Sequence, residues 1–70
     1  MNREILDALR ARYEADIAEA NATINIYLTN SVGIGEHPQL IEEMDKQIAI
    51  AAEAEDKLDY LKKHFSTYKS

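Results

Sequence analysis

One short stretch decides the fold: Gly33-Ile34-Gly35-Glu36-His37-Pro38, which holds every glycine and proline of the chain. Gly33 suits the left-handed conformation that closes a helix, and Ile34 supplies the apolar contact that often follows it. Pro38 suits the first position of a new helix, where its missing amide hydrogen costs nothing. The stretch therefore predicts a turn over 33–37 between a helix that ends and a helix that begins.

The residues before this turn predict a helix over about 3–32. They are rich in strong helix formers, and Asn2 is a suitable N-cap. Apolar residues recur at steps of three and four, which keeps them on one face of a helix. These residues are Leu6, Leu9, Tyr13, Ile17, Ala20, Ile24 and Leu28. They predict one apolar stripe along the whole helix.

The residues after the turn predict a second helix over about 38–66, with the same spacing of apolar side chains. Its stripe consists of Leu40, Met44, Ile48, Ala51, Ala54, Leu58, Leu61 and Phe65. Acidic residues gather near its start, and Lys62, Lys63 and His64 lie near its end. Both placements complement the helix dipole.

A connection of about five residues makes two helices antiparallel neighbours. If the chain folds back around Gly35, the numbers of facing residues add to about 71. Leu6 then faces Phe65, Ala20 faces Ala51, and the two stripes meet along nearly their full length. We therefore expect an all-α fold, a single helical hairpin that spans residues 1–70.

One hairpin of 70 residues is a small folding unit. A chain of this size buries only about 60% of its unfolded surface, and the absence of cysteine excludes disulfide support. Two helices also shield only part of each other's stripe, while Ile5, Ile41 and Ala52 widen the apolar surface. We expect a second copy to close the core as a dimeric four-helix bundle. The residues expected to form the core and the self-association surface are Leu6, Leu9, Tyr13, Ile17, Ala20, Ile24, Leu28, Leu40, Met44, Ile48, Ala51, Leu58, Leu61 and Phe65.

The net charge of −5 is divided by position along the hairpin. Residues 1–12 and 57–70 carry seven basic and three acidic side chains, whereas residues 13–56 carry Lys46 against ten carboxylates. A hairpin is then basic at its open end and acidic towards its middle and turn. This favours an antiparallel dimer, in which each basic end lies beside the partner's acidic part. The alternative interpretation is a set of solvated pairs within each helix, such as Glu42–Lys46.

The chain offers little for catalysis or for a metal. Di-iron bundles need Glu-x-x-His pairs, but His37 lies in the turn, and Leu61 stands three residues before His64. Glu36 and His37 supply at most two ligands. There is no cysteine, and the glycine pair lacks the third glycine and the preceding strand of a dinucleotide loop. We expect no enzyme activity, no cofactor and no metal.

Nucleic acid is the alternative partner. Arg3, Arg10, Arg12, Lys57, Lys62, Lys63 and Lys69 form a basic end, with Tyr60, Phe65 and Tyr68 between them. Dimeric helical hairpins that bind RNA share this architecture, which is a likeness of fold alone. An isoelectric point near 4.8 argues against it.

Nothing in the sequence suggests a membrane or a secretory route. No apolar run approaches 18 residues, and the opening residues 1–4 do not resemble a signal peptide. We therefore expect a cytoplasmic protein.

The segment Tyr27-Leu28-Thr29-Asn30-Ser31-Val32-Gly33-Ile34-Gly35-Glu36-His37-Pro38 is similar to one in short uncharacterised proteins of tailed phages that infect marine bacteria. The flanks over 8–14 and 54–58 resemble the same group. The resemblance implies a viral protein made in a bacterial cytoplasm, with a place in the virion left open. It implies no activity, cofactor or functional residue.

Together these features predict a small, non-enzymatic protein that self-associates and acts through its surface in interaction or assembly. The apolar stripes are expected to carry that role, with Gly33, Gly35 and Pro38 shaping the turn. The alternative is an RNA-binding dimeric hairpin that uses the basic end.

Overall fold

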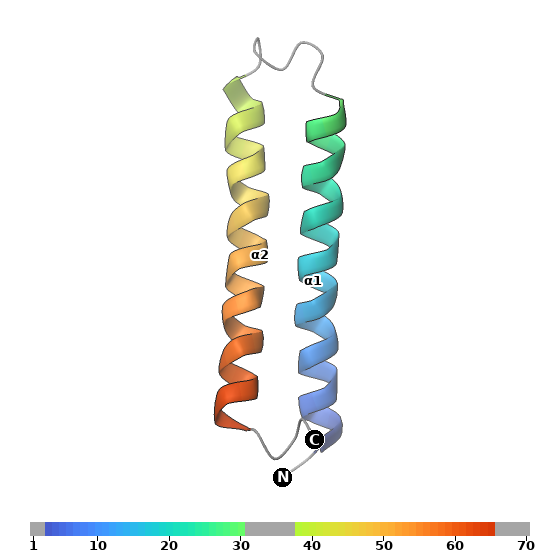
Figure 1. Ribbon diagram of the computed structural model, residues 1–70, viewed down its shortest axis with the longest axis vertical. Coiled ribbons are helices and arrows are strands. Elements are labelled where there is room, and N and C mark those ends of the chain that lie inside the picture. Colours follow the sequence, from blue (N-terminus) through green and yellow to red (C-terminus); the bar gives the residue numbers. More distant parts are fainter. Residues whose placement is uncertain (1–2, 31–37, 66–70) are drawn as a thin grey trace.

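A computed structural model describes residues 3–30 and 38–65 of the chain. Two helices make up almost all of this part: α1 spans Arg3–Thr29 and α2 spans Pro38–His64. Figure 1 shows them side by side and antiparallel along their whole length, in a rod of 51 × 15 × 15 Å. The predicted all-α hairpin is confirmed. Gly33 and Gly35 lie outside the described residues.

The helix α1 ends at Thr29, before the predicted end at residue 32. The amide of Asn30 still donates to the carbonyl of Ile26 at 3.0 Å, but Asn30 itself is in a turn. The hydroxyl of Thr29 donates to the carbonyl of Asn25 at 2.9 Å. Residues 29–32 are all poor helix formers, and side chains such as threonine compete for backbone groups in this way. The prediction overlooked this weak run because it relied on the absence of glycine and proline.

The helix α2 begins at Pro38, as predicted for a proline at the first helical position. It ends at His64, earlier than the predicted residue 66, and the amide of Phe65 closes the last turn on the carbonyl of Leu61 at 3.0 Å. Lys62, Lys63 and His64 occupy the last turn, where positive charge is favourable.

The register of the two helices agrees with the predicted one. Leu6 and Leu61 form the buried core at the open end, and Phe65 packs against them. Lys57 lies over the ring of Tyr13. Their residue numbers, like those of Leu6 and Phe65, add to within one of 71, whereas those of Leu6 and Leu61 add to 67, because Leu6 packs against residues one turn apart on α2. The short connection therefore set the pairing of the helices.

The core is thin. Among the described residues, only Leu6, Ala20, Ala54 and Leu61 are buried. Ala20 is the most enclosed of these, which makes it the narrow point between the helices. Of the two alanines in the predicted stripe of α2, Ala54 is buried, whereas Ala51, which was expected to face Ala20, is half-buried. Nine of the expected core residues are half-buried: Leu9, Tyr13, Ile17, Ile24, Leu40, Met44, Ala51, Leu58 and Phe65.

Two expected core residues are exposed in the hairpin. Leu28 is 57% exposed and Ile48 is 52% exposed, so neither closes the contact between α1 and α2. A helix turns by about 100° per residue, and a step of four therefore rotates a side chain by about 40°. Leu28 is rotated in this way from Ile24, and Ile48 from Met44. Both residues belong to the apolar stripes but lie at their edges.

Candidate functional site

The accessible surface of the chain is large for its size. It amounts to 5414 Å², above the about 4450 Å² of a compact folded monomer of 8.0 kDa, because the chain forms a thin rod of 51 × 15 × 15 Å. Much of the exposed surface is apolar. Exposed large apolar side chains are Ile5, Ile26, Leu28, Ile41, Ile48, Ile50 and Tyr60. The outer faces of the rod are therefore the place to look for function.

The first candidate is an apolar hollow in the half of the rod near the turn. It has a volume of about 260 Å³ and is lined by Ile17, Asn21, Ile24, Ile48, Ala51, Ala52 and Glu55. Leu28 follows Ile24 by one turn, and Ile41 precedes Ile48 by two, so they extend this surface towards the turn. We call the surface formed by Ile24, Leu28, Ile41, Ile48 and Ala52 the turn-side patch.

The second candidate is a hollow of about 250 Å³ in the other half of the rod. It is lined by Leu9, Tyr13, Lys57, Tyr60, Leu61 and Phe65. Ile5 precedes Leu9 by one turn, so it continues the same side of α1, and it is 58% exposed. We call the surface formed by Ile5, Leu9, Tyr13, Tyr60 and Phe65 the open-end patch.

The two patches lie on opposite faces of the hairpin. In α1, Leu9 is rotated about 60° to one side of the buried Leu6, and Asn21 is rotated about 60° to the other side. In α2, measured from the buried Ala54, Lys57 is rotated about 60° to one side and Ile48 about 120° to the other. No residue lines both hollows. The hairpin therefore has one apolar surface on each face, and the two occupy opposite halves of its length.

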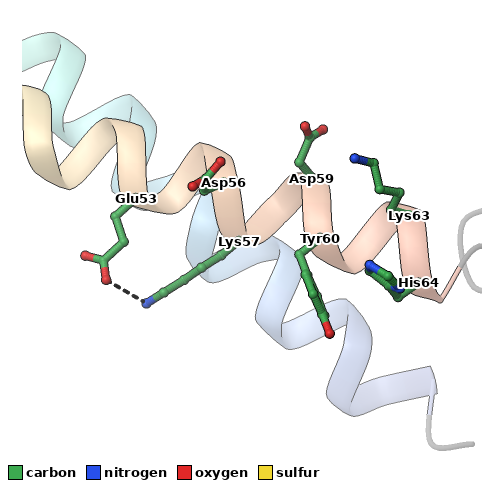
Figure 2. Close-up of a pocket in the computed structure, with 7 residues that line it drawn as sticks. All are labelled: Glu53, Asp56, Lys57, Asp59, Tyr60, Lys63 and His64. Carbon is green, nitrogen blue, oxygen red and sulfur yellow. Dashed lines mark ion pairs between the residues drawn. The ribbon is translucent and has the colours of Figure 1, made fainter.

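A wider hollow of about 480 Å³ runs along the outer side of α2 towards the open end. It is lined by Glu53, Asp56, Lys57, Asp59, Tyr60, Lys63 and His64. Figure 2 shows that all seven side chains come from this one helix, with Lys57 reaching back towards Glu53 and with Tyr60 beside His64. The hollow is thus a shallow surface with mixed charges.

Two contacts organise this hollow. The ammonium of Lys57 lies 3.8 Å from a carboxylate oxygen of Glu53, which is an exposed pair. The rings of Tyr60 and His64 lie 4.1 Å apart between centroids, with 33° between their planes. Tyr60 is itself 61% exposed. This pair presents an accessible aromatic surface at the basic end.

The described residues contain no group of three His, Asp or Glu side chains that could hold a metal ion. Glu36 and His37, the half-site considered in the sequence, lie outside the described residues. Lys46 pairs with Glu43 at 3.5 Å, and not with Glu42, its partner in the alternative interpretation of the charges. Neither described helix is long and apolar enough to cross a membrane.

Sequence reasoning missed the contact of Lys57 with Tyr13 and that of Tyr60 with His64. The second was visible as a spacing of four residues within a helix, which brings side chains together. The first crosses between the helices and was open to prediction from the register, since the residue numbers of Tyr13 and Lys57 add to 70. Reasoning from the stripes also treated the apolar surface as one continuous face, whereas the structure divides its exposed part between two faces.

Comparison of the chain with protein-family models, with curated proteins and with solved structures finds no match.

Proposed function

We propose that this chain is a small, non-enzymatic protein that self-associates and acts in interaction or assembly. Two hairpins pair face to face in opposite directions and form a four-helix bundle. The observation that carries this proposal is the set of large apolar side chains that the hairpin leaves exposed, among them Leu28, Ile41 and Ile48 at 57%, 68% and 52%.

These exposed apolar side chains fit contact with a second copy of the chain. A stable protein interface buries about 800 Å² on each partner. The exposed side chains are of the kind that such an interface removes from water, since Leu28, Ile41 and Ile48 are each more than half exposed on one face. Pairing two hairpins gives these side chains an apolar neighbour. A hairpin that stays alone leaves them in water.

The distribution of charge supports the antiparallel orientation. The basic residues gather in 1–12 and 57–70, and the carboxylates gather in 13–56. Because the ends of α1 and α2 near the termini lie together (Figure 1), one end of the rod is basic and the remainder is acidic. Antiparallel rods bring opposite charges together, whereas parallel rods bring like charges together.

The test is the molar mass by light scattering over a hundredfold range of concentration, with helix content measured by circular dichroism on the same samples. We expect a helical species with a mass of at least twice 8.0 kDa. A helical species that stays at 8.0 kDa throughout would overturn the proposal.

We also propose where the protein acts. The likeness of residues 27–38 to phage proteins supports a viral protein that works in a bacterial cytoplasm. Detection of the chain by mass spectrometry in purified virions would assign it to the particle, and its absence there would restrict it to the infected cell.

One observation favours RNA binding as a second candidate. The exposed ring of Tyr60 stacks with His64, and Lys57 and Lys63 lie beside them (Figure 2). Aromatic rings next to positive charges bind single-stranded nucleic acid through base stacking. Against this stand three carboxylates in the same hollow, from Glu53, Asp56 and Asp59.

Titration of a fluorescent single-stranded RNA at low salt tests the second candidate. Binding that weakens with salt and is lost in Lys62→Glu/Lys63→Glu would support it. A control variant away from the basic end is Ala22→Glu/Ala49→Glu, which adds two negative charges at exposed positions and removes no positive charge. No binding at low salt, or equal loss in both variants, would remove RNA as a partner of this surface.

A further inference from the structure

The two apolar patches lie on opposite faces and in opposite halves of the rod, and this restricts how copies can pair. Surfaces that pair with themselves form closed dimers, whereas surfaces that pair with a different surface form rings or open-ended chains. The turn-side patch and the open-end patch are different surfaces. The choice between the two kinds of contact therefore depends on which patch faces which.

Contact between two turn-side patches fits poorly. In parallel hairpins these patches overlap fully, but the acidic halves of both chains then lie together. In antiparallel hairpins that overlap along their full length, the turn-side patch of one chain faces the other chain's open half. On that face the open half carries charged side chains such as Arg10, Glu14 and Lys62. Only a partial overlap of the rods brings the two patches together.

Contact between the turn-side patch of one copy and the open-end patch of the next fits well. Two antiparallel rods that overlap fully bring the turn half of one chain beside the open half of the other. The face that carries the open-end patch then meets the turn-side patch directly. Ile41, near the turn end of α2, comes beside Ile5, near the start of the neighbour's α1. These two side chains are 68% and 58% exposed, respectively.

We infer that the chain assembles by stacking its turn-side patch on the open-end patch of the next copy, with successive hairpins antiparallel. The inference rests on the proposed self-association and adds the surfaces and the orientation. Each added chain covers one patch and leaves its other patch free, so the assembly is open-ended. Each pair of neighbours is a four-helix bundle, and the step between neighbours is about 10 Å, the usual distance between packed helices.

Two patch variants test this inference. The turn-side variant is Ile41→Glu/Ile48→Glu, and the open-end variant is Ile5→Glu/Tyr60→Glu. All four residues are exposed, so the hairpin core is untouched. The matched control is Ala22→Glu/Ala49→Glu, which adds the same charge at exposed positions on the outer sides of α1 and α2.

The expected result is specific to two different surfaces. Each patch variant alone stays at 8.0 kDa, because it lacks one of the two surfaces that every contact needs. Mixed in equal amounts, the two variants form a complex of twice that mass. In this complex the intact turn-side patch of one chain packs against the intact open-end patch of the other. The mixture grows no further, while the wild type and the control exceed twice 8.0 kDa as concentration rises.

Cysteine cross-linking gives an independent measurement, because the chain has no cysteine of its own. An equal mixture of Ile41→Cys and Ile5→Cys should form the mixed disulfide in preference to either homodimer, since a disulfide needs Cα atoms about 4.4–6.8 Å apart. A control on the outer side of α1, away from both patches, is Ala22→Cys mixed with Ile5→Cys, which should not cross-link beyond background.

Other outcomes would overturn the inference, and they show whether the proposed self-association fails together with it. A wild type that stays at 8.0 kDa overturns both. A wild type that stops at twice 8.0 kDa, with the open-end variant unaffected and the turn-side variant monomeric, keeps self-association but shows a closed dimer through one patch. Efficient cross-linking of Ile41→Cys to itself leads to the same conclusion.

Discussion

The ammonium of Lys57 on α2 lies 5.7 Å from the centre of the Tyr13 ring on α1. It is a polar contact that joins the two helices in the half of the rod where the core also contains Leu6 and Leu61. A cation over an aromatic face contributes about 0.5–1 kcal/mol at an exposed site. The contact therefore reports on the register of the hairpin.

We predict that Lys57→Met and Tyr13→Leu are coupled. A double-mutant cycle, measured by chemical denaturation at one chain concentration, should give an interaction energy of about 0.5–1 kcal/mol. Glu53→Gln removes the exposed pair with the same lysine and should change stability by less than about 0.5 kcal/mol. A coupling of zero, or an equal effect of Glu53→Gln, would show that the contact does not hold the helices in register.

The thin core predicts a strong dependence on single large side chains. Leu61 is 5% exposed and packs with Leu6, so Leu61→Ala should lower the free energy of unfolding by about 2–5 kcal/mol. This is a large part of the stability of so small a chain. Leu40→Ala, at a half-buried position far along the same helix, should cost less. Equal effects of the two variants would contradict the placement of the core at the open end.

The narrow point at Ala20 predicts intolerance of larger residues. Ala20 is 1% exposed, and a leucine there has no room without moving the helices apart. Ala20→Leu should lower the free energy of unfolding by about 1–3 kcal/mol. The control is Ala22→Leu on the exposed side of the same helix, where the change should stay within about 0.5 kcal/mol. A neutral Ala20→Leu would mean that the helices are not closely apposed at this residue.

Self-association predicts that thermal stability depends on concentration. Association that favours the folded chain raises the midpoint of unfolding as concentration rises. Calorimetry over a hundredfold range should show this rise for the wild type and for the control Ala22→Glu/Ala49→Glu. The turn-side variant Ile41→Glu/Ile48→Glu should unfold at the same temperature throughout. A constant midpoint for the wild type would contradict self-association.

Salt should weaken the association. The attraction between basic and acidic parts of neighbouring rods is screened within about 10 Å at 0.1 M salt. The apparent association constant should therefore fall between low and moderate salt, and Lys62→Glu/Lys63→Glu should reduce it most at low salt. Sedimentation velocity at three salt concentrations measures both effects. An association that strengthens with salt would show that apolar contact alone determines the pairing.

The sequence by itself determined the two helices, their antiparallel pairing and their register. Apolar residues at steps of three and four predict a helix without reference to other parts of the chain, and a connection of a few residues leaves only one way to fold back. The contacts of Phe65 with the Leu6–Leu61 core and of Lys57 with Tyr13 follow from these two facts. The helix ends were less well predicted, because weak helix formers such as Thr29 and Asn30 end a helix gradually.

Only the tertiary structure decided which apolar residues remain exposed and on which face. Leu28 and Ile48 belong to the same stripes as Leu6 and Leu61, yet two of these residues are exposed and two are buried. The physical reason is that the apolar stripe on each helix is wider than the line of contact between the two helices. Small rotations around each helix, together with the pairing of the two, move some residues to one edge of that line and some to the other. The division into a turn-side patch and an open-end patch therefore depends on both helices at once.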